Sequence, residues 1–458
     1  MKIPTPPKWV LILLVVALGG YCIYLRLNQT ESAPPGLKHS RSISGQYFVL
    51  LKDSYKKPIL KDGKVKDSVR KNQKLQNKVK RDQKKGDIIK DFKKDHNLDI
   101  KEDSVLVDAV SGFRLYQKAT TQAERQINDA ARERIERDPR VEAVITNFPI
   151  ILEDPIQQED PIQQEDPIQQ VDWGIVDPPE NRVTCAVSVA GGPVNSSGIT
   201  DRVIWIVDTG VEIHDDLYVE TDIELVRSFV AGVTSASDDN GHGTHVAGIA
   251  AAMINSVPGD PTVPEIGCTG VSAGAKVIPI KVLNSLGRGT WIDLVDALNH
   301  IGTLNRDNDV VNLSLGSYCT DCSDNDYKAV KKAIEALADD KTFVVIAAGN
   351  SAGDVKKQMP ACLDKDKVFT VSAINCDNSC AFYSNYGNGV DFVAVGTRVL
   401  STYIGRDPLG QSRYKIMTGT SMAAAVVSGI IHARGSAPIN GTQVLCDNPN
   451  PPIARRVP

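Results

Sequence analysis

The sequence predicts an α/β fold with a doubly wound, mostly parallel sheet and helices on both faces, preceded by a small α+β domain. Two observations lead to this prediction. After residue 200, short apolar runs alternate with longer segments in which apolar residues recur at helical spacing, which is typical of a parallel sheet. Before residue 153, several strand-like runs surround one amphipathic helix, which is typical of a smaller α+β unit.

The α+β domain is expected to span residues 45–152. Apolar runs predict its strands, at residues 47–51, 104–110, 112–116 and 141–145. Thr121 and Glu124 form a capping box that predicts the start of a helix, and Asp138-Pro139 predicts its end. The buried face of this helix is then expected to consist of Ile127, Ala131 and Ile135.

A tandem repeat separates this domain from the rest of the chain. The hexapeptide Glu-Asp-Pro-Ile-Gln-Gln occurs three times between Glu153 and Gln170. A short repeat that is rich in proline and has no apolar period predicts an extended linker. The chain is therefore expected to divide into the segments 1–30, 45–152, 153–172 and 173–458.

Strands and helices are expected to alternate in the segment 173–458. Strands are predicted at residues 202–207, 277–283, 310–315, 343–348, 368–374 and 390–395. Helices are predicted at residues 242–254, 291–304, 326–337 and from 421 onward, followed by a Pro-rich tail. Functional groups in such sheets gather beyond the carboxyl ends of the strands, where Asp208 and Asn350 are both expected.

An apolar segment near the N-terminus predicts export. Trp9–Leu25 is almost wholly apolar, and its length of about 17 residues with basic flanks fits either a signal peptide or a signal anchor. The rest of the chain is then expected to be secreted or held at the cell surface. Membrane contact is expected only through this N-terminal segment.

The charge pattern argues against a nucleic-acid partner. The formal net charge is -4, and the lysine-rich stretch at residues 52–101 has acidic residues interleaved throughout. Such a mixture is typical of a solvated surface, whereas a nucleic-acid patch needs an excess of positive charge on one face.

The cysteines are concentrated in the second half of the chain. One of the nine, Cys22, lies in the apolar segment, and the other eight follow residue 180: Cys185, Cys268, Cys319, Cys322, Cys362, Cys376, Cys380 and Cys446. An even number in an exported region predicts disulfides, with no particular pairing. The spacings Cys319-x-x-Cys322 and Cys376-x-x-x-Cys380 also leave paired metal ligands open.

Four short motifs carry the candidate chemistry, and they contain, in chain order, Asp208, His242, Asn350 and Ser421. A serine hydroxyl is a weak nucleophile near neutral pH, so it needs an adjacent base, and that base needs an orienting group. Ser421 is therefore expected to be the nucleophile, His242 its base, and Asp208 the residue that orients His242.

Two groups are expected to stabilise a developing oxyanion. Asn350 can donate from its side-chain amide, and Ser421 can donate from its backbone N–H at the start of a helix. An aspartic protease would need a second Asp-Thr/Ser-Gly motif, which is absent. His242 and His245 lack the HExxH spacing of a helical zinc site, so His245 is expected to be structural.

Together the motifs resemble those of the subtilisin family of serine proteases, near its proteinase K and bacterial subtilisin branches. The matching stretches, within residues 173–429, are Val-Asp-Thr-Gly-Val, Asn-Gly-His-Gly-Thr-His-Val-Ala-Gly, Ala-Ala-Gly-Asn and Gly-Thr-Ser-Met-Ala. The resemblance implies a serine endopeptidase that acts on protein or peptide substrates and needs no cofactor for catalysis. Structural calcium stays open, because no calcium-binding loop is clearly matched.

The resemblance also implies which segments bind substrate. Ser314, Leu315 and Gly316 resemble the strand that forms one wall of the primary specificity pocket. The segment Gly287, Arg288 and Gly289 is similar to the family's edge segment, which pairs with an extended substrate. The domain 45–152 resembles an inhibitory propeptide, an intramolecular partner that the enzyme itself removes, and the mature enzyme would start near Trp173.

Three positions after the nucleophile depart from the family pattern. The family usually has Pro, His and Ala where this chain has Ala425, Val426 and Ser428. These residues are expected to lie inside the helix, where they affect packing more than chemistry. They also motivate the alternative of a catalytically impaired binding protein on the same scaffold.

Overall fold

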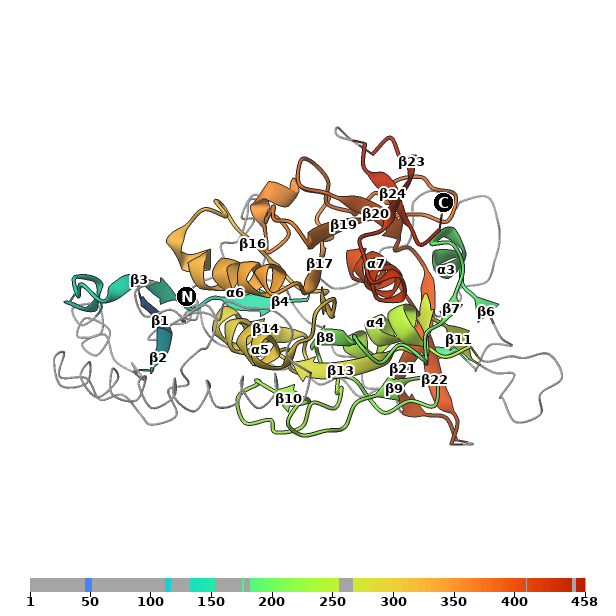
Figure 1. Ribbon diagram of the computed structural model, residues 1–458, viewed down its shortest axis with the longest axis horizontal. Coiled ribbons are helices and arrows are strands. Elements are labelled where there is room, and N and C mark those ends of the chain that lie inside the picture. Colours follow the sequence, from blue (N-terminus) through green and yellow to red (C-terminus); the bar gives the residue numbers. More distant parts are fainter. Residues whose placement is uncertain are drawn as a thin grey trace, which may run out of the picture. The chain divides into compact units, whose positions relative to one another are not determined.

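The computed structural model describes residues 46–51, 112–116, 132, 134–152, 175–176, 182–254, 267–408, 410–446 and 450–457 (Figure 1). Several predictions lie outside these residues, namely the N-terminal apolar segment, the strand at 104–110, the helix start at Thr121 and the linker at 153–172. None of the helices within the described ranges is long and apolar enough to cross a membrane.

The large domain is built on a central sheet that has ten strands among the described residues. The order along the sheet is β10 (Arg227–Ser228), β13 (Lys276–Lys281), β8 (Ile204–Asp208), β15 (Val310–Leu313), β17 (Phe343–Ala347), β19 (Val368–Ile374), β20 (Phe392–Val395), β24 (Pro452–Arg455) and β23 (Ile439–Gln443). A further strand, β9 (Tyr218–Val219), pairs with β13. Every pairing is parallel except that of β23 with β24, which confirms the mostly parallel sheet.

Helices cover both faces of this sheet. The helices of the large domain are α3 (Cys185–Val189), α4 (His242–Ala251), α5 (Trp291–Leu304), α6 (Lys328–Asp339) and α7 (Thr420–Arg434). Ile204 and Ile206 of β8 belong to the core beneath α4 and α7, whereas Trp205 and Val207 belong to the core beneath α5 and α6. Successive strand side chains point to opposite faces, so a doubly covered strand must be apolar throughout.

The N-terminal domain contains a three-stranded antiparallel sheet. Its order is β2 (Gly112–Tyr116), β1 (Gln46–Leu51) and β3 (Val141–Thr146). These bounds confirm three of the predicted strands. Ile135 is fully buried in a helical turn, and the helical conformation ends before Asp138-Pro139, as predicted.

Short strands surround the central sheet. They are β5 (Ile175–Val176), β6 (Arg182–Val183), β7 (Val194–Asn195), β11 (Cys268–Thr269), β12 (Ser272–Ala273), β16 (Ser317–Tyr318), β18 (Gln358–Met359), β21 (Val399–Arg406) and β22 (Ser412–Met417). Figure 1 shows the β21–β22 hairpin beside α4, and contacts link β21 with that helix. Most of these strands are too short for an apolar period to predict them.

The structure corrects two expectations about helices and shows which elements the tail after α7 forms. Helix α4 ends at Ala251 and not at 254, because Ala252 leaves the helical conformation and Met253 N donates to Asp216 O. Helix α6 is preceded by a 3₁₀ turn, η2 (Asn325–Tyr327), where a single helix was expected. The Pro-rich tail after α7 contains β23 and β24, which extend the edge of the central sheet.

Candidate active site

Two neighbouring elements bring Asp208 and His242 together. Asp208 is the last residue of β8, and His242 is the first residue of α4. His242 Nδ1 lies 2.8 Å from Oδ1 and 3.0 Å from Oδ2 of Asp208, and both side chains are buried. Because the carboxylate accepts the Nδ1 proton, Nε2 is the ring nitrogen that can accept another proton.

A second buried carboxylate, that of Asp238, supports this pair. It accepts hydrogen bonds from Thr209 Oγ1, in the residue after Asp208, and from both N and Oγ1 of Thr244. Thr244 lies two residues after His242, so Asp238 joins the two segments that carry the pair. Sequence reasoning missed this role, although an acidic residue just ahead of a helix is a capping signal.

The environment of His242 raises the pKa of its imidazole. Burial by itself lowers this pKa, but the charge of Asp208, its hydrogen bond and the charge of Asp238 act in the opposite direction. The net result is a pKa above the usual 6.5. A base with a pKa near the working pH can both take up and return a proton.

His245, the second histidine of the motif, has a different environment. It is fully buried, and its Nε2 lies 2.8 Å from the carbonyl oxygen of Lys415. Burial lowers the pKa of His245 to about 3, so the ring is neutral and donates to that carbonyl. This arrangement has the structural character that the sequence predicts for His245.

Ser421 is the second residue of α7 and is 7% exposed. Its Oγ donates to Ser314 O at 3.4 Å, and its own carbonyl oxygen accepts a 3.0 Å hydrogen bond from Ser314 Oγ. The candidate nucleophile therefore lies directly against the segment predicted to bind substrate. In this arrangement the hydroxyl proton of Ser421 is directed at Ser314 O.

Asn350 lies beside the start of α7. Its Oδ1 accepts hydrogen bonds from Thr420 N at 2.9 Å and from Thr420 Oγ1 at 3.0 Å. These bonds fix the orientation of the amide, with Oδ1 toward Thr420 and Nδ2 as its donor end. A Cβ at Gly419 would lie 3.2 Å from Nδ2, so a side chain at that position would crowd the donor.

Asn385 holds the loop that carries Asn350. Its Oδ1 accepts from Ser351 N at 3.1 Å and from Gly353 N at 2.9 Å, while its Nδ2 donates to Ala348 O at 2.8 Å. Sequence reasoning missed Asn385, and no local pattern identifies it, because its partners lie more than thirty residues earlier in the chain.

The predicted substrate-pairing edge does pair with an extended strand. Arg288 and Gly289 belong to β14 (Arg288–Thr290), which pairs antiparallel with β4 (Pro149–Ile151) at the end of the N-terminal domain. Leu152 N adds a 2.8 Å hydrogen bond to Gly287 O. Gly287 has φ of +66°, and a Cβ there would lie 2.9 Å from the Leu152 side chain, so glycine suits both demands.

The second predicted substrate segment follows β15. Ser314 and Leu315 are not in a strand, contrary to the expected strand, and Gly316 leads directly into β16. Strand β4 pairs with β14 and also contacts β16, the strand that directly follows this second segment. A Cβ at Gly316 would lie 2.8 Å from Met359 O.

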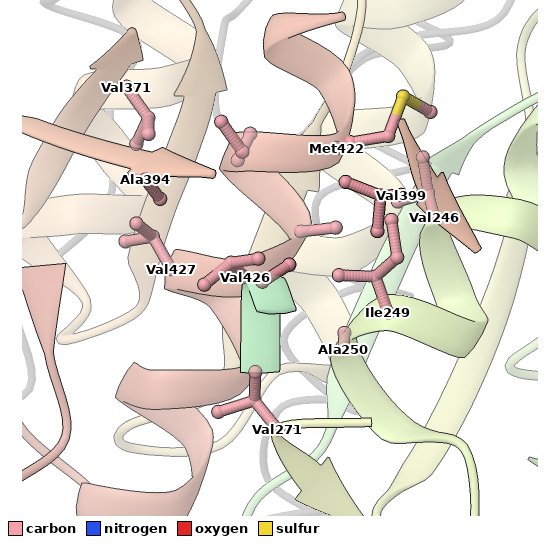
Figure 2. Close-up of a cluster of buried hydrophobic side chains, with 14 of the residues drawn as sticks. Val246, Ile249, Ala250, Val271, Val371, Ala394, Val399, Met422, Val426 and Val427 are labelled. Carbon is pink, nitrogen blue, oxygen red and sulfur yellow. The ribbon is translucent and has the colours of Figure 1, made fainter. Parts of the chain in front are cut away.

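The three positions after Ser421 that depart from the family pattern lie in the core, as expected. Ala425 and Val426 are buried within α7, and Figure 2 shows Val426 among apolar side chains that include Val246 and Ile249 of α4. Ser428 Oγ donates to the buried Asn312 at 2.9 Å. These residues therefore determine how α7 packs on α4 and on the sheet.

The prediction of disulfides is confirmed. Cys185 pairs with Cys376, and Cys380 pairs with Cys446, so Cys376 and Cys380 are not the metal-ligand pair that their spacing left open. Cys268 takes part in no disulfide among the described residues, and burial raises the pKa of its thiol.

One further cysteine cluster contains Cys319, Cys322 and Cys362, with all three sulfur atoms within 4.8 Å of one another. In the described part of the chain, this is the only place where three His, Cys, Asp or Glu side chains converge at metal-binding distances. Sulfur ligands do not suit calcium, which prefers oxygen. Structural calcium therefore remains a prediction.

Comparison with known proteins agrees with this geometry. The model of the subtilase family matches residues 200–433. Subtilisin BL of Lederbergia lenta is 36% identical over 259 residues, which cover 57% of this chain and 82% of that protein. M-protease of Shouchella clausii is 35% identical over 57% of this chain and 58% of its own length.

Among solved structures, a protease of Pseudoalteromonas arctica overlaps 54% of this chain and 80% of its own, with 25% identity and a TM-score of 0.44. The family match covers half of the chain, and the sequence identity to subtilisin BL extends over most of that relative. The chain belongs to the subtilase family and is a serine endopeptidase.

Proposed function

We propose that this endopeptidase is secreted or membrane-anchored, is made as a self-processing zymogen, and uses Asp208, His242 and Ser421 as its catalytic triad. Ser421 Oγ attacks the peptide carbonyl while His242 Nε2 takes its proton and later gives that proton to the leaving amine. Asp208 orients the imidazole and stabilises its positive charge. Asn350 Nδ2 and Ser421 N donate hydrogen bonds to the oxyanion.

The pairing of β4 with β14 is the observation that carries this proposal. An enzyme that binds peptides as an added strand needs an exposed strand edge beside its catalytic groups. Here that edge leads to the candidate site, because Ser285 O accepts a 3.1 Å hydrogen bond from Asn240, two residues before His242. The chain's own segment 149–152 occupies this edge in an extended conformation, as a substrate would.

The N-terminal domain has further contacts that suit an intramolecular inhibitor. Phe148 O accepts a hydrogen bond from Trp291 N, and Asn147 Oδ1 accepts one from Ile292 N, so the domain satisfies donors at the start of α5. Glu142 forms ion pairs with Lys328 and Lys332 of α6. These contacts support the view that residues 45–152 are a propeptide that keeps the β14 edge occupied.

The position of Leu152 supports a cleavage shortly after this residue. Leu152 is bonded to Gly287, at the end of the edge that leads toward Ser285 and His242. We therefore expect the first cut within the Glu-Asp-Pro-Ile-Gln-Gln repeats and close to their start.

Export of the enzyme rests on the apolar segment Trp9–Leu25 and on the cysteine pairing. Disulfides such as Cys185–Cys376 persist in oxidising compartments. One relative, from Xanthomonas campestris, is named an extracellular protease and is 32% identical over half of this chain. The exported enzyme would then act on protein and peptide substrates outside the cytoplasm.

The proposal is tested by intact mass and N-terminal sequencing of the expressed protein beside Ser421→Ala. The wild-type chain is expected to lose its N-terminal domain through a cut shortly after Leu152, whereas Ser421→Ala stays uncut because its nucleophile is missing. Circular dichroism of the variant controls for folding. Two folded proteins that both remain full-length would contradict self-processing.

A fluorophosphonate probe separates the enzyme from a catalytically impaired binding protein. The processed wild-type protein is expected to be labelled at Ser421, with no label on Ser421→Ala. Absence of label on a folded protein from which the N-terminal domain has been removed would contradict the proposed triad.

A further inference from the structure

The cluster of Cys319, Cys322 and Cys362 lies beside strands β16 and β18, and β16 directly follows the predicted substrate segment. Cys319 directly follows β16, and its N donates to Lys357 O at 2.8 Å. Cys362 follows β18 by three residues, and its N donates to Gln358 O at 2.8 Å. The backbone of the β16–β18 pair thus holds two of the sulfur atoms in place, and the proposed catalysis uses none of the three.

Cys322 has two alternative partners in this cluster. Its sulfur contacts those of both Cys319 and Cys362, whereas a sulfur atom can form only one disulfide. The Cα separations are 5.8 Å to Cys319 and 6.6 Å to Cys362, and both lie in the range in which a disulfide closes without backbone movement. Either pairing leaves one of the three thiols unused.

Burial distinguishes the two arrangements. Cys319 is 1% exposed, whereas Cys322 and Cys362 are partly exposed. When Cys322 pairs with Cys362, the remaining thiol on Cys319 is shielded from solvent. When Cys322 pairs with Cys319, the remaining thiol is that of Cys362, which reagents can reach.

We propose that these three residues form a thiol–disulfide exchange site and that Cys362 is its point of covalent modification. The Cys319 thiolate attacks Cys322 Sγ, the Cys322–Cys362 bond breaks, and its electron pair leaves on Cys362 Sγ as a thiolate. No oxidant or reductant is consumed, because one disulfide is exchanged for another. The Cys362 thiolate then reacts with an alkylating agent, or with a low-molecular-weight disulfide from which it displaces one thiolate.

The test is alkylation of the folded full chain, carried out on Ser421→Ala so that the sample does not digest itself. The protein is treated with iodoacetamide at pH 8, quenched in acid, and digested with pepsin without reduction, because acid stops exchange. Mass spectrometry is expected to find the label on Cys362 and a disulfide between Cys319 and Cys322 in the same molecules. Cys185–Cys376 and Cys380–Cys446 provide internal controls that should remain linked.

Two matched variants separate exchange from simple exposure. Cys319→Ser has no attacking thiolate, so Cys322 stays bonded to Cys362 and labelling of Cys362 should fall by more than about tenfold. Cys268→Ser, which removes a buried thiol outside the cluster, should label like the parent protein. Cys362→Ser should fix the Cys319–Cys322 disulfide and take no label in the cluster.

Three results would overturn the proposal. If Cys362 of the folded parent protein resists labelling, the form with a Cys319–Cys322 disulfide and an accessible Cys362 thiol does not occur. Equal labelling of Cys362 in the parent and in Cys319→Ser means that exchange is not required. Three reduced thiols with one equivalent of zinc, measured by elemental analysis, would instead identify a three-sulfur metal site.

Discussion

Thr209 Oγ1 donates a 2.8 Å hydrogen bond to Asp238 Oδ1, and this bond ties the residue after Asp208 to the start of the helix that carries His242. The same hydroxyl accepts a 3.0 Å hydrogen bond from Gly243 N. Hydrogen bonds between the two backbone segments therefore hold Asp208 and His242 in place, so the pair does not rely on its own hydrogen bond alone.

We expect Asp238→Asn to lower kcat by about ten- to hundredfold, the cost of a misplacement of catalytic groups of the order of 1 Å. An amide has a single acceptor oxygen and cannot accept every bond that Asp238 accepts. The variant should also shift the acid limb of the pH–rate profile to lower pH, because the charge of Asp238 helps to raise the pKa of His242. Asp222→Asn, at an exposed position, is the matched control, and a shift of equal size there would contradict the assignment.

The pH dependence of the enzyme follows from His242. The base must be neutral to accept the Ser421 proton, and its pKa is raised above 6.5, so kcat/KM should rise with pH through a midpoint above that value. Asp208→Asn should lower kcat by about 10⁴-fold, as in the better-studied triad of another fold, and should move the midpoint down. The measurement is kcat/KM from pH 5 to pH 9 with an uncharged peptide substrate, and a midpoint well below 6.5 in the parent enzyme would be incompatible with this role.

Asn350→Ala should reduce kcat by about 10²- to 10³-fold, the range known for the oxyanion donor of subtilisin, with little change in KM. Nδ2 is expected to donate only when negative charge develops on the substrate oxygen. Because Asn350 also accepts two bonds from Thr420, Thr420→Val serves as a control for damage to the start of α7. A change confined to KM would show that Asn350 binds the ground state instead.

Removal of the N-terminal domain should depend on Leu152. Leu152→Asp places a charge at a site that is 8% exposed and packed against Gly287, so self-cleavage should slow by about tenfold or more. Leu152→Ile, which keeps an apolar side chain, should process almost normally. The half-time of processing after refolding is measured on gels, and equal half-times for the two variants would argue against β4 as the segment presented to the nucleophile.

Local sequence patterns predicted the long helices and strands of the fold better than the short strand and the single side chain that lie around the site. Helix α5 and strand β19 are observed at their predicted bounds, since each has a strong apolar period and clear ends. Strand β4 has three residues and a partner more than a hundred residues away, so no local period could identify it. The same limit applies to Asn385, whose role depends on hydrogen bonds to the loop after β17, more than thirty residues earlier.

The buried histidine His432 should make the folded protein sensitive to acid. Burial lowers the pKa of His432 to about 4, and its ring lies 2.7 Å from Ser272 Oγ. Between about pH 6.5 and pH 4 the unfolded chain binds a proton at this residue and the folded chain does not, so stability falls as the pH falls. Because pH 5 lies about 1.5 units below the unfolded pKa of 6.5 and above the folded pKa, about 2 kcal/mol of unfolding free energy is lost there. Urea unfolding of Ser421→Ala with and without His432→Gln, at pH 7 and pH 5, isolates this contribution because all other titrating groups are shared. The parent should lose about 2 kcal/mol more than the variant between the two pH values, and equal losses would mean that His432 takes up its proton without unfolding.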